Sequence, residues 1–126
     1  MKSSNTLPEQ LLELGLEALD LNFRTQARGL PGTPDIAFDH ERLAVFVHGC
    51  YWHRHDGCDR ARTPTKDTLV WLDRFRGIVA RDQQVTASLG ALGWFVFVVW
   101  ECEIRRDHDV AAARVASALH QAGPLV

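Results

Sequence analysis

The stretch HGCYWHRHDGC, from His48 to Cys58, holds most of the residues in this chain that could do chemistry. It contains three histidines and two cysteines, and it directly follows an apolar run. Imidazole nitrogen and thiolate sulfur are ligands that zinc prefers, and an imidazole can also act as a general base. The stretch could therefore form a structural metal site, a catalytic centre, or both.

A metal site is indicated by Cys50, His55 and Cys58, which supply three ligands at short spacing, and by Cys102 after a second apolar run. Together they would complete a tetrahedral zinc site, and closed sites of this kind stabilise folds rather than catalyse. The alternative is three buried free cysteines. Disulfides are not expected, because the number of cysteines is odd and a reducing compartment disfavours them.

A zinc site that uses only one histidine would leave His48 and His53 for other chemistry. An imidazole beside a buried carboxylate is a common general base, and Asp82 is the candidate partner. Asp82 continues the helical spacing of the apolar Phe75, so it is expected to face the core, where an unpaired charge is costly. The alternative is an aspartate at the edge of that face, paired with Arg81 or solvated.

Two further carboxylates precede this stretch. Asp35 follows Pro34 at the start of a predicted strand, where it could ligate a hard cation such as Mg²⁺ or be an ordinary strand-edge aspartate. Glu9 ends a capping box that begins at Thr6, which predicts a backbone partner for its side chain. Glu9 also lies in helical step with the apolar Leu12.

Contacts with nucleic acid are suggested by Tyr51 and Trp52, since aromatic side chains on a loop can stack on bases or wedge between them. Packing on the metal site is the alternative. Between Arg54 and Arg81 there are seven Lys or Arg against four Asp, which fits a phosphate contact surface and a solvated helix face equally well. The net charge of −2 lacks the basic excess of most polyanion binders.

The first half of the chain predicts one helix and three short strands. The helix runs from about Pro8 to Asp20 and contains apolar residues at helical spacing. The stretch LNFRTQARG alternates weakly and ends in a turn. PDIAFDH and RLAVFVHG are two β-rich runs with a polar connection, the pattern of a hairpin.

The second half predicts a long helix, a strand and a final helix. The long helix runs from Asp67 to Leu89, with Asp67 and Thr68 as candidate caps. Its apolar stripe consists of Leu72, Phe75, Val79 and Leu89. WFVFVVW is expected to be a strand buried on both faces, followed by a helix from Asp107 to Gln121 that ends before Gly123-Pro124. The order αβββαβα predicts a mixed central sheet flanked by helices.

Length and composition predict a single domain over residues 1–126, since 126 residues with 46% hydrophobic content can bury one core. No apolar run is long enough to span a membrane, and MKSSNTLPEQ lacks the apolar segment of a secretory signal. A cytoplasmic protein without a membrane partner is therefore expected.

Several stretches together resemble the very-short-patch repair (Vsr-type) DNA mismatch endonucleases. They are LPGTPDIAF, AVFVHGCYWHRH, the Trp71-Leu72 and Ala80-Arg81-Asp82 segments, and LGWFVFVVWEC. The resemblance extends from about Thr6 to Cys102. It implies a restriction-endonuclease-like α/β fold, related to the PD-(D/E)xK nucleases, with a structural zinc site. It also implies an enzyme that nicks one strand beside a T:G mismatch.

The resemblance implies a role for each candidate in the active site. Asp35 and the backbone carbonyl of Val47 correspond to the ligands of the catalytic Mg²⁺. His53 corresponds to the general base and Asp82 to its hydrogen-bond partner. His48 corresponds to a second active-site histidine near the scissile phosphate, and Glu9 to a first-helix glutamate of the same site.

The resemblance also implies the zinc ligands and the residues that enter the DNA. The structural zinc ligands correspond to Cys50, His55, Cys58 and Cys102. The aromatic residues that intercalate beside the mismatch correspond to Tyr51, Trp52 and Trp71.

This sequence differs from the family pattern at two places that matter for function. Two residues, Asp56 and Gly57, separate His55 from Cys58 where one is expected, which leaves the choice between His53 and His55 as zinc ligand open. Only the short extension over residues 1–5 precedes the first helix, in place of a basic segment that helps to clamp DNA.

Together with these patterns, the resemblance implies a monomeric, Mg²⁺-dependent endonuclease that acts on double-stranded DNA, and the mismatched substrate is implied by the resemblance alone. One alternative keeps the enzyme class and changes the substrate: a Vsr-like nicking enzyme of a restriction, homing or phage-defence system that cuts undamaged DNA. A second alternative is a zinc-stabilised DNA-binding module without catalytic activity.

Overall fold

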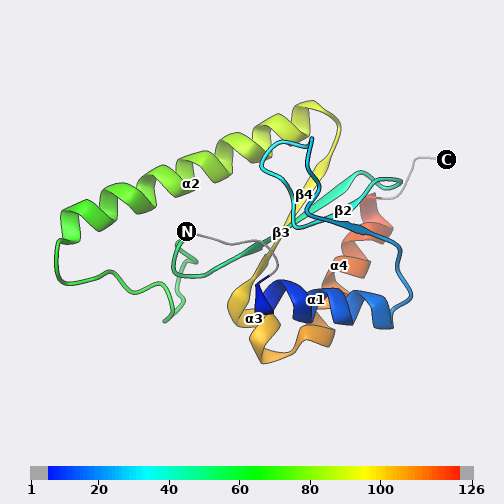
Figure 1. Cartoon of the computed structure of the whole chain (residues 1–126), viewed down its shortest axis with the longest axis horizontal. Helices are drawn as coiled ribbons and strands as arrows, with labels where there is room; N and C mark the ends of the chain where they lie inside the picture. Colours follow the sequence, from blue (N-terminus) through cyan, green and yellow to red (C-terminus); the bar gives the residue numbers. More distant parts are fainter. Residues whose placement is uncertain (1–5, 123–126) are drawn as a thin grey trace.

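A computed structural model describes residues 6–122 as a four-stranded sheet with helices on both faces (Figure 1). The predicted mixed α/β architecture is confirmed. The expected extension over residues 1–5 and the Gly123-Pro124 helix end lie outside the described residues. The elements are α1 (Leu7–Ala18), β1 (Arg24–Thr25), β2 (Ile36–Phe38), β3 (Leu43–His48), α2 (Thr68–Ala91), β4 (Phe95–Trp100), α3 (Glu101–Arg106) and α4 (His108–Ala122).

The strands lie in the order β1-β2-β3-β4, so β3 is central and β4 is at an edge. The predicted hairpin is present, because β2 and β3 pair antiparallel with Ile36 opposite Val45. β3 and β4 are parallel, which requires a long crossover between them, and α2 provides it.

Side chains of β3 alternate between two cores, which decides what the strand presents to each face. Val45 and Val47 belong to the larger core, with α1 and α4. Ala44 and Phe46 face the smaller core, which includes Leu89 of α2. Because successive side chains of a strand point to opposite faces, His48 at the end of β3 lies on the α2 side.

The expectation that β4 is buried on both faces is wrong. Phe95 is 57% exposed, and Val99 is the only fully buried residue of the strand. The physical reason is its edge position, since β4 has one neighbouring strand and receives only partial cover from the helices. The central strand β3 also has a continuous apolar sequence, and it is buried throughout. An apolar run by itself therefore does not distinguish a central strand from an edge strand.

The expected inner face of α2 is partly wrong as well. Phe75 and Leu89 are buried as predicted, but Leu72 is 38% exposed. Figure 1 shows the reason: the N-terminal half of α2 extends past the sheet, so no core covers that turn. Asp67 occupies the N-cap position but forms no capping side-chain hydrogen bond.

The capping of the first helix and the presence of one additional helix differ from prediction. Thr6 is the N-cap of α1, but the capping box is wrong, because Thr6 forms no side-chain cap bond and Glu9 turns into the protein interior. The additional helix α3 follows β4 directly, and Glu103 accepts a hydrogen bond from the backbone N–H of Trp100 at its start. The final helix begins after Asp107, whose side chain caps it.

No helix among residues 6–122 is long and apolar enough to cross a membrane.

The crossing of α1 and α4 gives a stability prediction. A Cβ atom on Gly15 would lie 2.8 Å from the Cβ of Ala112 and 2.9 Å from the carbonyl oxygen of His108. Gly15→Ala should therefore lower the free energy of unfolding by about 1–3 kcal/mol, measured by thermal or urea unfolding. Gly77→Ala is the matched control, since that Cβ meets nothing within 4 Å and should stabilise α2 by about 0.5–1 kcal/mol. Equal effects of the two changes would contradict this close helix crossing.

Candidate active site and metal centre

His48, His53 and Asp82 form a compact group between β3 and α2. Their ligand atoms lie within 4.8 Å of one another. His53 Nδ1 is 2.6 Å from Asp82 Oδ2, and the His53 ring stacks on the His48 ring at 3.9 Å between centroids. When Nδ1 carries the proton, its N–H donates a hydrogen bond to this carboxylate, and Nε2 is left as the basic nitrogen of His53. The group has the geometry of an oriented general base.

A cavity of about 250 Å³ opens beside this group. His48, His53 and Asp82 line it, and Arg81 adds a positive charge to its wall. The Arg81 guanidinium forms no ion pair or side-chain hydrogen bond within residues 6–122, so the alternative Asp82–Arg81 pair is not formed. The rest of the wall is mainly apolar, and includes Phe46, Trp52, Ile78, Val85, Val96 and Val98.

Asp35 lies directly before β2, with its side chain against the backbone of β3. It is 3% exposed, and its Oδ2 accepts a hydrogen bond of 2.7 Å from the N–H of Val47. Val47 immediately precedes His48, so the fold places this carboxylate beside the strand end that carries the histidine group. The expected neighbourhood of Asp35 and Val47 is therefore present.

Carboxylates of α1 gather near Asp35. Glu9 is 1% exposed, and its Oε2 accepts a hydrogen bond of 3.1 Å from Gln26 Nε2. The backbone N–H of Gln26 in turn donates to the carbonyl of Asp35 at 3.0 Å. Burial, with additional repulsion from Glu17 and Asp35, raises the pKa of Glu13 above its usual value. This concentration of carboxylate oxygens, two of whose side chains are buried, fits a hard divalent cation.

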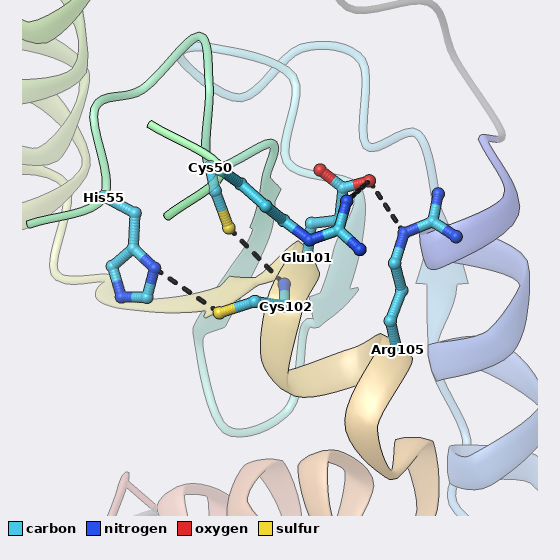
Figure 2. A network of polar contacts seen from close by, with 6 residues as sticks. Cys50, His55, Glu101, Cys102 and Arg105 are labelled. Atoms are coloured by element: carbon cyan, nitrogen blue, oxygen red, sulfur yellow. Dashed lines mark hydrogen bonds and ion pairs between the residues drawn. The ribbon is translucent and has the colours of Figure 1, made fainter. Parts of the chain in front are cut away.

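The four predicted zinc ligands form a second group. Figure 2 shows three of them, Cys50, His55 and Cys102. The ligand atoms of Cys50, His55, Cys58 and Cys102 lie within 4.8 Å of one another, and none of the cysteines forms a disulfide. The distance from Cys102 Sγ to His55 Nδ1 is 3.4 Å. Zinc bonds of about 2.1–2.3 Å at tetrahedral angles separate neighbouring ligand atoms by about 3.6 Å. The donor set therefore fits zinc in both chemistry and spacing.

The structure separates the two histidines that the sequence left undecided. His55 lies among the cysteines and stacks on Trp100 at 4.2 Å between ring centroids, whereas His53 contacts Asp82. The residue inserted before Cys58 is accommodated by Gly57, which adopts a left-handed conformation with φ of 69°.

The thiols of this group differ in their surroundings. Burial raises the pKa of Cys50 to about 12, while the backbone N–H of Arg60 lowers that of Cys58. A metal ion must therefore displace a proton that the buried thiol holds firmly at neutral pH.

An ion-pair network supports the metal group from the side of α3 (Figure 2). Glu101 Oε2 lies 2.8 Å from Arg105 Nε and 4.0 Å from Arg60 Nη1. Arg60 follows Cys58 in the loop, and Glu101 precedes Cys102 in sequence. The pairs therefore connect the two chain segments that carry the ligands.

The three aromatic residues predicted to enter DNA lie together, around a fourth that the sequence analysis did not assign to the site. The ring centroid of Phe75 is 5.2 Å from that of Tyr51, 6.4 Å from that of Trp52 and 5.9 Å from that of Trp71. Phe75 is 3% exposed, whereas the other three are only partly buried. We call Tyr51, Trp52, Trp71 and Phe75 the aromatic cluster.

Two polar residues of this region were also missed by the sequence analysis. Gln26 connects Glu9 to Asp35, and Arg54 contacts the aromatic cluster. No pattern in the sequence marks Gln26. Arg54 has a weak signal, because it lies between two histidines whose side chains serve different sites.

Comparison with known proteins identifies the family. The model of the family "DNA mismatch endonuclease Vsr" matches residues 1–60. The type II nicking enzyme V.XorIIP of Xanthomonas oryzae is 43% identical over 119 residues, which cover 94% of this chain and 86% of that protein. V.NaeI of Lentzea aerocolonigenes is 36% identical over 124 residues, covering 94% and 72%.

The DNA mismatch endonuclease Vsr of Escherichia coli is 40% identical over 101 residues, which cover 80% of this chain but 64% of that protein. Identity at this level over most of several relatives establishes common descent, and it agrees with a mixed α/β fold that carries an oriented histidine beside buried carboxylates. The protein belongs to the Vsr-type family of DNA endonucleases.

Proposed function

We propose that this protein is a Mg²⁺-dependent endonuclease that nicks one strand of double-stranded DNA beside a T:G mismatch, on a restriction-endonuclease-like fold with structural zinc. The observation that carries the proposal is the 2.6 Å contact between His53 Nδ1 and Asp82, next to the strand end at which Asp35 is buried. An oriented base and an oxygen-rich cation site side by side are the two parts that metal-assisted phosphodiester hydrolysis needs.

Each part of the site has a role in this reaction. Asp35 and the carbonyl of Val47 would hold Mg²⁺, which when bound supplies electrostatic stabilisation of the negative charge that develops on the phosphate. His53 Nε2 takes the proton of the attacking water, while Asp82 fixes the ring and stabilises the imidazolium. The ring of His48, stacked on His53, restricts that ring further, and His48 would lie near the scissile phosphate.

Mismatch recognition is assigned to Tyr51, Trp52 and Trp71. Their rings are partly exposed and share a support in Phe75, which suits a wedge that enters between base pairs. A mismatched pair opens at lower cost than a matched pair, so insertion of a wedge discriminates between the two.

Two further properties complete the proposal. We treat residues 1–126 as one domain, because Leu12 of α1 and Val115 of α4, near opposite ends of the described chain, lie in the same core. We treat the enzyme as a monomer, because cutting a single strand needs a single active site.

A second candidate substrate is undamaged DNA. It is favoured by the relatives that are named type II nicking enzymes, including V.XorIIP, the relative with 43% identity. In that case the aromatic cluster would support binding without selecting the mismatch.

The two substrates are distinguished by nicking of end-labelled duplexes that are matched, T:G-mismatched or methylated, with Mg²⁺ present. We expect the T:G duplex to be nicked at least about tenfold faster than the matched duplex. Equal rates would reject mismatch repair and support the second candidate. No nicking of any duplex, by a protein that still binds them, would support the non-catalytic DNA-binding module.

A further inference from the structure

Arg54 lies between His53 and His55, and its side chain points away from both of their sites. Its backbone is left-handed, with φ of 55°. His53 contacts Asp82 and His55 contacts Cys102, whereas the Arg54 guanidinium lies 4.0 Å above the ring of Phe75. Three successive residues thus serve the catalytic group, the aromatic cluster and the metal group.

The guanidinium of Arg54 is also a donor to the loop that joins the metal group to α2. Nη1 donates to the carbonyls of Tyr51 at 3.0 Å and Arg62 at 3.3 Å. Nη2 donates to the carbonyl of Ala61 at 2.7 Å and to Thr63 Oγ1 at 3.0 Å. A planar fork with several donors can satisfy such a set at once, which a single ammonium group cannot.

From these contacts we infer that Arg54 is a specificity-determining positioning residue, which holds the aromatic cluster in the conformation that enters mismatched DNA. The inference deepens the proposed function and depends on it. Arg54 contacts two members of the cluster, through the backbone of Tyr51 and the ring of Phe75. It also binds the neighbouring loop over residues 61–63, so it connects three separate segments of the chain.

The physical argument concerns the cost of ordering. Side chains that must be immobilised on binding reduce affinity, and contacts that fix them beforehand remove this cost. Phosphate contacts act on every duplex alike, whereas wedge insertion depends on how easily the base pairs open. Loss of Arg54 should therefore weaken binding to a mismatched duplex more than binding to a matched one.

The test is Arg54→Met, which keeps an unbranched apolar stem like that of arginine and removes the charge and the donors. In single-turnover nicking, the enzyme concentration that gives half of the maximal rate should rise about tenfold for the T:G duplex, with less than about a twofold change for the matched duplex. The maximal rate on the T:G duplex should stay within about threefold of wild type, because His53 and Asp82 are retained.

Two variants control for charge and for folding. Arg76→Met removes a positive charge from the same groove beside α2, and Arg76 forms no ion pair or side-chain hydrogen bond within residues 6–122. It should weaken binding to both duplexes equally. Arg54→Lys keeps a cation near Phe75 with fewer donors, and should restore part of the affinity for the T:G duplex.

By discrimination we mean the ratio of the affinities for the T:G and matched duplexes. The inference is overturned if Arg54→Met keeps the wild-type discrimination, which includes the case in which it loses equal affinity for both duplexes. If Arg54→Met fails to fold, a folded Arg54→Lys enzyme with wild-type discrimination overturns it, and one with reduced discrimination supports it. Trp52→Ala separates this inference from the proposed function. If Trp52→Ala loses discrimination and Arg54→Met keeps it, only the role of Arg54 is wrong; if Trp52→Ala keeps it, the proposed wedge is wrong.

Discussion

His53→Ala lowers the single-turnover rate of nicking by about 10³-fold, while the affinity for DNA changes little. The reason is that His53 Nε2 is the basic nitrogen of an imidazole that Asp82 orients through a 2.6 Å contact. Asp82→Asn leaves an amide of the same shape that cannot stabilise the imidazolium, and we expect a loss of about 10²-fold or more.

The combined variant tests whether the two side chains act as a unit. Removing both should cost little more than removing His53 alone, because Asp82 acts through His53. His40→Ala is the matched control, since His40 is exposed in the connection between β2 and β3 and should retain full activity. Rates are measured with excess enzyme on the T:G duplex, and binding is measured separately with Ca²⁺ in place of Mg²⁺. Multiplicative losses in the double variant would contradict the assigned pair, and full activity of His53→Ala would contradict the assigned base.

We expect Cys50→Ser to abolish zinc binding and to remove a large part of the stability. Cys50 is 0% exposed and its ligand atom lies within 4.8 Å of those of His55, Cys58 and Cys102. Since a serine hydroxyl is a poor zinc ligand, the zinc content should fall from about one ion per chain to nearly zero. The free energy of unfolding should fall by about 3 kcal/mol or more, which lowers the unfolding midpoint by about 10 °C.

Removal of the metal from the wild-type protein by a chelator provides the comparison for Cys50→Ser. A strong chelator should lower the midpoint of the wild-type protein towards that of Cys50→Ser, and it should leave the variant unchanged. The apparent zinc affinity should decrease as the pH falls, because burial raises the pKa of Cys50 to about 12 and binding must release its proton. His120→Gln, a change of an exposed histidine in α4, should keep its zinc. Wild-type protein purified without added metal that contains no zinc but is fully folded would reject the assignment.

The metal group shows how much a ligand pattern can predict. Residue type and spacing selected Cys50, Cys58 and Cys102 together with a histidine, His53 or His55, because few other side chains bind zinc. The distance in sequence to Cys102 could not indicate proximity. The parallel pairing of β3 with β4, which places His48 opposite Trp100, brings Cys102 beside the loop that carries Cys50.

Helical periodicity correctly predicted one contact of the active site, but it wrongly predicted the burial of a residue in the same helix. Asp82 was expected to need a histidine because it follows Phe75 at helical spacing, and it contacts His53. The same periodicity predicted that Leu72 is buried in the core, but Leu72 is 38% exposed. The reason is that periodicity identifies a face of a helix and not how far along that face the core extends.

What the sequence by itself determined is the membership of the chain in its family, the set of residues able to bind metal and the order of most elements, since these depend on residue type and local spacing. Only the tertiary structure decided that His53 contacts Asp82 while His55 joins the cysteines, that β4 lies at an edge, and that the Arg54 guanidinium lies over the ring of Phe75. The physical reason is that these features depend on the path of the chain between distant segments. The left-handed turn at Arg54, the position of α2 and the sheet order fix that path together.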